Sequence, residues 1–146
     1  MSDQSAGSSF TLSTTLPLDY ADAVSAVRDE LAEQGFGILT EIDLAATMKA
    51  KLDKDMAPQV ILGACRPPLA YKALQADPSV AAMLPCNVVV RALGDGTSKV
   101  EAFDPDAMMS FSTGEAIAEV AADAKQRLVA TMEQLTARHP THHEES

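Results

Sequence analysis

The fold of this chain is decided by one stretch of sequence, NVVVRALGDGTSKVEAF, which spans residues 87–103. Residues 87–93 are rich in valine, and residues 97–103 alternate apolar with polar side chains; both patterns are typical of β-strands. Gly94-Asp95-Gly96 lies between them and supplies residues that tight hairpin turns favour. The stretch therefore predicts an antiparallel β-hairpin.

Strands and helices alternate along the chain before this hairpin. The apolar run Val60-Ile61-Leu62 predicts a strand at 59–65 that is buried on both faces, central, and part of the hairpin's sheet. Similar patterns predict strands at 10–16 and 36–42, a helix capped by Asp19 that ends at Gly35, a helix capped by Asp43 that ends near Leu52, and helical turns at 69–76 and 79–84.

The chain after the hairpin predicts one long helix. Residues 112–115 have the spacing of a capping box, an apolar stripe of helical period runs from Ile117 to Leu135, and His139-Pro140 stops the helix. The element order is then β-α-β-α-β-α-β-β-α, which predicts an α+β fold with a mixed, mostly antiparallel sheet of about five strands covered by helices. We expect one domain at 10–139, a disordered N-terminus at 1–9 and a loose tail at 140–146.

Composition excludes several classes of function. The net charge of -10 and the scattered basic residues argue against nucleic acid and against an anionic membrane surface as partners. No apolar run approaches the roughly 20 residues that span a bilayer. The N-terminus has neither a basic start nor an apolar segment, so we expect a cytoplasmic protein. Its two cysteines are then free thiols, or else a redox-active pair.

The common catalytic and nucleotide-binding motifs are absent from the sequence. Gly35-Phe36-Gly37 and Gly94-Asp95-Gly96 do not have the context of a nucleotide fingerprint and are interpreted as turns. Two proline-rich segments remain, at 63–68 and 84–87, and each holds one cysteine at a strand end. They make Cys65, Arg66, Cys86 and Asn87 candidate ligand-binding residues.

The chemistry of these cysteines has two interpretations. A thiolate at Cys65 is favoured if it meets the free N–H groups of the following helix or the charge of Arg66. Alternatively, both cysteines are core residues, because an unpaired cysteine behaves as a small hydrophobe. A soft metal is a weaker hypothesis, with Cys65 and Cys86 as its ligands and Met83, Met108 or Met109 nearby.

Two other groups of polar residues are weaker candidates. Glu41 and Asp43 are either a carboxylate pair at a ligand site or, respectively, an exposed strand residue and a helix cap. The histidines, His139, His142 and His143, lie in or beside the tail, and no rigid shell is expected around them. No histidine is therefore expected to serve as a base for a cysteine.

Three segments together resemble the family catalogued as domain of unknown function 302, over about residues 18–109. They are 35–43, 61–70 and 84–90. The residues that match the family pattern are Glu41, Asp43, Lys51, Cys65, Pro68, Pro85 and Cys86. Arg66 replaces an expected small polar residue, and Tyr71 stands where some relatives have histidine. The resemblance implies a compact α+β fold with a bent or split sheet, and a homodimer, but no assigned activity.

Three hypotheses for the function follow. The first is a homodimeric binding protein with a small-ligand or soft-metal site near Cys65 and Cys86; the second is a thiol-dependent enzyme or redox protein; the third is a structural interaction module with core cysteines. The two helical turns between the cysteines predict that the chain returns antiparallel, so that the cysteines approach each other.

Overall fold

A computed structural model of the chain describes residues 10–110 and 114–140. Its centre is an open sheet of five strands in the order β1-β5-β4-β3-β2, and each neighbouring pair is antiparallel. The strands are β1 Thr11–Leu16, β2 Gly37–Asp43, β3 Gln59–Cys65, β4 Cys86–Ala92 and β5 Ser98–Phe103. The α+β fold and the element order are as the sequence predicts, with the difference that no strand pair is parallel.

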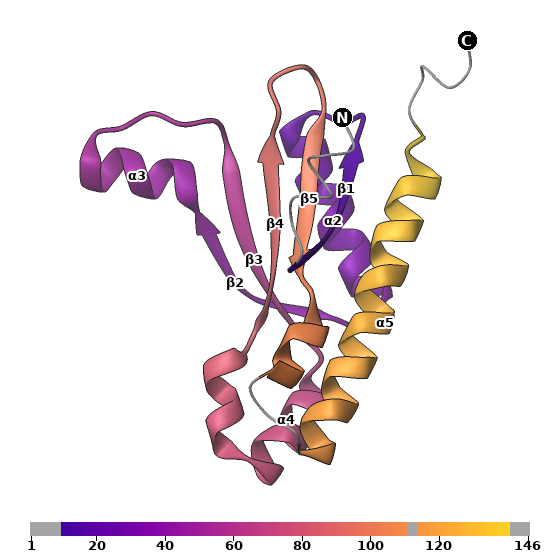
Figure 1. Ribbon diagram of the computed structural model, residues 1–146. Coiled ribbons are helices and arrows are strands. Elements are labelled where there is room, and N and C mark those ends of the chain that lie inside the picture. Colours follow the sequence, from indigo (N-terminus) through magenta and orange to yellow (C-terminus); the bar gives the residue numbers. More distant parts are fainter. Residues whose placement is uncertain (1–9, 111–113, 141–146) are drawn as a thin grey trace.

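The helices cover one face and one end of this sheet (Figure 1). Helices α2 and α5 lie along one face, α4 and the 3-10 helices η1 and η2 lie at the end, and α3 projects away from the body. Their bounds are α2 Tyr20–Glu33, α3 Leu44–Leu52, α4 Pro67–Ala76, η1 Pro78–Met83, η2 Pro105–Ser110 and α5 Glu115–Arg138. None of the helices among the described residues has the length and apolarity that crossing a membrane requires.

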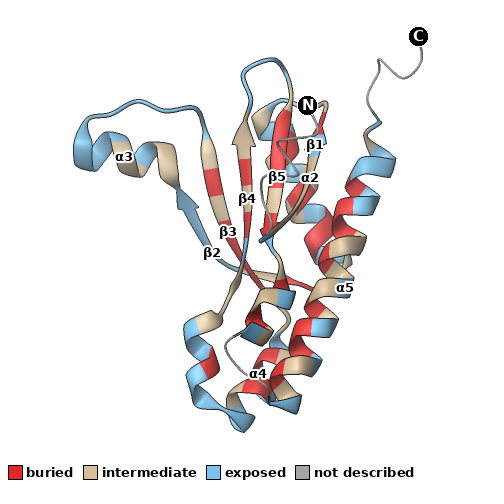
Figure 2. Ribbon diagram, viewed as in Figure 1, coloured by how far each residue is buried: buried red, intermediate tan, exposed pale blue. Residues whose placement is uncertain are grey.

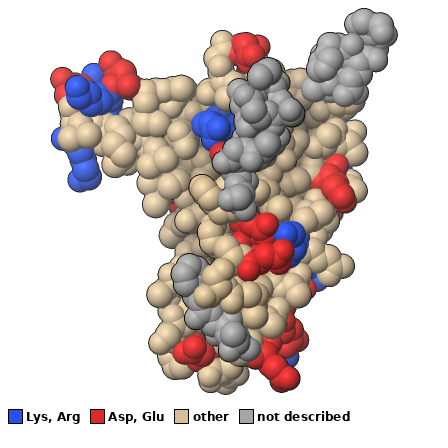
Figure 3. Space-filling view, viewed as in Figure 1, with Lys and Arg blue, Asp and Glu red and all other residues tan. Residues whose placement is uncertain are grey.

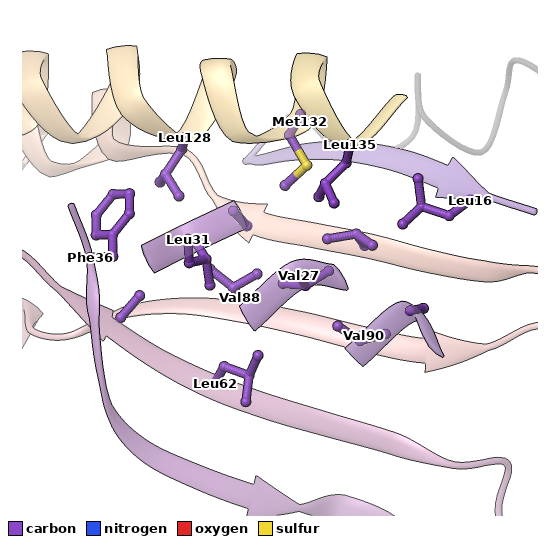
Figure 4. Packing of buried hydrophobic residues seen from close by; sticks show 14 of the residues in the cluster. Leu16, Val27, Leu31, Phe36, Leu62, Val88, Val90, Leu128, Met132 and Leu135 are labelled. Carbon is purple, nitrogen blue, oxygen red and sulfur yellow. The ribbon is translucent and has the colours of Figure 1, made fainter. Parts of the chain in front are cut away.

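Two clusters of buried side chains hold these layers together. The larger lies between the sheet and the two long helices, where Leu128 and Leu135 of α5 and Leu31 of α2 point toward strand residues such as Val88 (Figure 4). The smaller joins the N-terminal half of α5 to α4, η1 and η2; its buried members are Ala73, Val80, Met108, Ile117, Val120 and Ala121. Helix α5 therefore connects both cores.

The predicted hairpin is confirmed, because β4 and β5 pair antiparallel and Leu93 N–H donates to Thr97 O across the turn. Gly35 ends α2 with a φ of 92°, in the left-handed region that glycine adopts without strain. Two details differ from prediction. Strand β3 is interior as predicted, with β2 and β4 on either side, but it is not buried on both faces, since Ile61 is half-buried and helices cover only one face of the sheet. The N-cap of α5 is Gly114, so Glu115 begins the helix and cannot close a capping box; residues 112 and 113 lie outside the described residues.

The region from Leu39 to Pro58, which we call the arm, differs from the rest of the fold. It contains most of β2, all of α3 and the segment that leads to β3, and not one of its side chains is buried (Figure 2). Figure 1 shows α3 at its tip, away from the other helices. Asp43 caps this helix as predicted, since its Oδ1 accepts from Ala46 N–H at 2.9 Å.

Candidate functional site

The two cysteines lie near each other at the end of the sheet that α4 and α5 cover. Helix α4 and η1 carry the chain out and back, so β4 returns antiparallel to β3 and Cys86 pairs directly with Ala64. Facing Cα atoms in such a pair are about 5 Å apart and consecutive ones about 3.8 Å, which puts the Cα atoms of Cys65 and Cys86 within roughly 9 Å. The predicted approach of the two residues is thus found, and both are free thiols.

A small apolar pocket lies where the two cores meet. Cys65 and Cys86 both line it, together with Phe36, Ala64, Arg66, Leu69, Ala70, Leu84, Val120, Asp123 and Ala124. It offers about 20 Å³ to the centre of a water-sized sphere. A single water needs roughly 10–15 Å³ on this measure, so the pocket has room for one small occupant.

Three charged side chains form a cluster beside this pocket. Arg66 Nη1 donates to Asp123 Oδ2 at 2.6 Å, and Arg127 Nε lies 3.3 Å from both carboxylate oxygens. Arg127 also donates from Nη1 to the carbonyl of Gln34 at 2.8 Å. Two guanidinium groups therefore share one carboxylate, which leaves a surplus positive charge. The Arg66 Nε is buried, and no partner for it exists within the described part of the chain.

The start of α4 gives the Cys65 thiol no hydrogen-bond donor from its first turn. Pro67 and Pro68 have no N–H group, and the next two N–H groups, of Leu69 and Ala70, both donate to the carbonyl of Arg66. The guanidinium of Arg66 is in turn held by Asp123. The available N–H groups of the helix start are thus engaged elsewhere, and Nη1 of Arg66 is engaged by Asp123.

The acid-base properties of the thiols follow from this arrangement. Burial, and secondarily the neighbouring Cys65, raises the pKa of Cys86 from 9.0 to about 11. Burial also raises the pKa of Cys65. Both cysteines are therefore neutral thiols at pH 7, whereas nucleophilic cysteines have lowered pKa values.

The remaining predicted site residues lie apart from the pocket. Asn87 is exposed and pairs with Gly63, one residue beyond Cys86. Glu41 is exposed on β2 and forms an ion pair with Arg28, while Asp43 is engaged as the cap of α3. These two carboxylates therefore have separate structural partners and do not join the cysteines.

The methionines and the described histidine also lie outside the pocket. Met83, Met108 and Met109 pack in or against the smaller core. His139 follows the last residue of α5 as its C-cap, and His142 and His143 lie outside the described residues. No group of three or more histidine, cysteine or acidic side chains suited to a metal ion is found in residues 10–110 and 114–140.

Comparison with known proteins identifies the relatives of this chain. The family model described as Domain of unknown function DUF302 matches residues 12–135. The chain belongs to this family. A solved relative is the crystal structure of an uncharacterized conserved DUF302 protein from Bacillus stearothermophilus, which is 26% identical, has a TM-score of 0.78 and is matched over 88% of this chain and 99% of its own. No curated protein matches the chain.

Within this DUF302 chain, the most informative residue that sequence reasoning missed is Asp123. It lies 57 positions from its partner Arg66, so no local motif connects them. One signal was available: Asp123 stands between Val120 and Ala124, on the side of α5 that carries the apolar stripe. A charged residue in that position needs a partner of opposite charge. Which residue provides it depends on how α4 and α5 pack.

Proposed function

We propose that this protein is a homodimeric binding protein that holds one soft monovalent metal ion, of the copper(I) class, at Cys65 and Cys86. The observation that carries the proposal is that two cysteine residues from neighbouring strands line one apolar pocket with room for a single small occupant. Homodimerisation is supported by the family resemblance and by the commonness of two-fold assemblies.

The size and chemistry of the pocket favour an ion over an organic ligand. About 20 Å³ is far below the roughly 300–1,000 Å³ of pockets that hold small organic molecules. Thiolate sulfur is a soft ligand that selects copper(I), zinc or iron–sulfur clusters. Structural zinc sites need four ligands, and two sulfurs suit the low coordination number of copper(I) better.

The charges beside the pocket also fit this ion. Two thiolates around one monovalent cation carry one net negative charge, and burial of that charge alone is unfavourable. The cluster of Arg66, Arg127 and Asp123 carries one net positive charge, and two of its members line the same pocket. The positive charge of the cluster therefore balances the negative charge of the two thiolates with their bound metal ion.

A thiol-dependent enzyme is the weaker hypothesis for the same site. Its nucleophile would need a lowered pKa, and the pKa values of both cysteines are raised. The third hypothesis, core cysteines in a structural module, predicts no metal binding at all. We place the protein in the cytoplasm, where a reducing environment keeps both thiols available for a metal.

The test is a titration of reduced, metal-free protein with copper(I) under anaerobic conditions, in competition with a coloured copper(I) chelator. Wild type is expected to bind one ion per chain, and Cys65→Ser and Cys86→Ser to bind more than about 100-fold more weakly, because loss of an outer-shell contact alone costs up to that factor. Binding should strengthen with pH, since neutral thiols must release protons.

The matched control replaces His139, His142 and His143 with alanine and is expected to retain full affinity. Wild type that fails to compete with the chelator would favour the core-cysteine hypothesis. Equal binding by wild type and both serine variants would place the ion elsewhere on the chain and would likewise refute the proposal.

A further inference from the structure

The arm is a part of this fold that its own chain leaves uncovered. Helix α3 has only nine residues, and none of them is buried. Isolated helices shorter than about 12–15 residues are marginal in water, and helices in proteins depend on packing of an apolar face. Contacts beyond those of the single chain are therefore expected to stabilise α3.

Large hydrophobic side chains are concentrated on the arm. Leu39 is 60% exposed, Ile42 45%, Leu52 62% and Met56 40%, which makes four of the eight large exposed hydrophobics in the described residues. These four residues fall within one short segment, because the arm extends only from Leu39 to Pro58. Such concentration is typical of an interaction surface, whereas single exposed hydrophobic residues are ordinary.

The charge on the arm indicates what kind of partner fits. Glu41, Asp43, Asp53 and Asp55 are its acidic residues, and Lys49, Lys51 and Lys54 its basic ones, so it is nearly neutral in a chain of net charge -10. Figure 3 shows the two signs side by side at the projecting tip. Lys49 pairs with Asp53 and Asp55, while Lys51 and Lys54 form no ion pair within the described part of the chain.

A second copy of the chain satisfies these conditions. Two-fold symmetry brings the same patch of each copy together, and a patch of mixed sign is complementary to itself. The arm contributes -1 to the net charge of -10, so the rest of the chain carries -9 and contact between copies elsewhere is on average repulsive. A strongly cationic or strongly anionic partner would be attracted by one set of charged residues on the arm and repelled by the other.

We propose that the arm is the homodimer interface, with Leu39, Ile42, Leu52 and Met56 of each copy packed near the two-fold axis. This inference rests on the homodimer proposed above and adds the surface that forms it. It is independent of metal binding, because the pocket lies at the opposite end of β3.

The experiment measures molar mass by light scattering of the full chain across micromolar concentrations. Wild type is expected at twice the mass of the chain. Leu52→Glu should weaken the dimer at least about tenfold, since a charge enters the centre of an apolar contact twice in each dimer. The matched control is Tyr71→Glu on α4, which is 64% exposed and adds the same charge outside the arm; it is expected to leave the dimer unchanged.

Hydrogen exchange of residues 44–52 provides a second measurement on unmodified protein, and these amides should exchange faster as dilution dissociates the dimer. A monomeric wild type would overturn the proposed homodimer and the interface together. A dimeric wild type with an equally dimeric Leu52→Glu would overturn the interface alone. Weakening by Tyr71→Glu of the same size would also refute it, because added charge would then explain both effects.

Discussion

Strands β2 and β3 form an antiparallel pair whose two ends differ in their surroundings. One end, which we call the body end, lies at the pocket, and the other end leads into the arm. At one end Gly37 pairs with Cys65, next to the pocket, and the side chains around it pack against α4 and α5. At the other end Asp43 pairs with Val60, and the chain leaves the body for the arm. The same pair of strands thus carries a closed, charge-compensated site and an open, apolar surface about one strand length apart.

This difference separates two sources of stability. The body end is stabilised within one chain, through burial and the ion pairs around Asp123. The arm has a capped helix with ion pairs only at its surface, and surface ion pairs contribute roughly 0–1 kcal/mol. Changes at the body end should therefore act at every protein concentration, and changes on the arm only where copies associate.

The largest expected effect comes from shortening one leucine side chain in the body of the protein and comparing it with the same change on the arm. Leu62 of β3 is fully buried in the larger core, and Leu62→Ala is expected to lower the free energy of unfolding by about 2–5 kcal/mol. Leu52→Ala removes an exposed side chain of the arm. Its effect should vanish as protein is diluted below the dissociation constant of the dimer.

Urea denaturation at several protein concentrations measures both variants. The comparison fails if Leu52→Ala destabilises dilute monomer as much as Leu62→Ala does, since α3 would then belong to the cooperative core. It also fails if the Leu62→Ala effect depends on concentration as that of Leu52→Ala does.

The next effect is a pH dependence at the body end. The pKa of Cys86 rises from 9.0 to about 11 on folding, so its contribution is fully present below about pH 9 and is lost as the pH rises through the folded-state value. Two pKa units correspond to about 3 kcal/mol. The unfolding free energy of reduced, metal-free wild type should therefore fall toward pH 11 by about this much more than that of Cys86→Ser.

Cys65→Ser serves as the control, because it keeps the Cys86 thiol, whose pKa is raised mainly by burial, and its pH profile should therefore follow wild type more closely than that of Cys86→Ser. Identical slopes for wild type and Cys86→Ser between pH 9 and 11 would show that the Cys86 thiol is not shielded from water.

Much of the fold is predictable from sequence because its signals are local. The Gly94-Asp95-Gly96 turn defines the hairpin, and Asp43 defines the start of α3. The order of β3 and β4 is less local, because it depends on where β2 adds to the sheet. The approach of Cys65 and Cys86 was nevertheless predictable, since two helical pieces between neighbouring strands return the chain antiparallel.

The environment of the cysteines was not predictable in the same way. Arg66 was one of two groups that the sequence offered to stabilise a thiolate at Cys65, and only the packing of α5 shows that Asp123 engages it. Likewise, Pro67-Pro68 indicates the start of a helix. Which acceptor the N–H groups of Leu69 and Ala70 bond to depends on backbone geometry, which the sequence does not show. Exposure of the arm has no clear sequence signal either, because α3 has apolar residues at helical spacing as a buried helix would.

The smallest expected effect is a difference in stability between substitutions of two glycines, Gly37 of β2 and Gly63 of β3, near the body end of this strand pair. A Cβ added to Gly63 would lie 2.7 Å from Pro85 Cγ and closer still to Thr40 Oγ1, and the proline ring cannot rotate away. Gly63→Ala should therefore lower the free energy of unfolding by about 1–2 kcal/mol through overpacking.

A Cβ at Gly37 would meet only the carbonyl of Cys65, at 3.8 Å, which is ordinary contact. Gly37→Ala is thus the matched control, expected within about 0.5 kcal/mol of wild type or slightly more stable, because alanine reduces the entropy of the unfolded chain. Urea denaturation of both variants decides the matter: equal destabilisation would mean that neither β2 at Gly37 nor β3 at Gly63 tolerates a side chain, and no loss in Gly63→Ala would mean that Pro85 and Thr40 move aside easily.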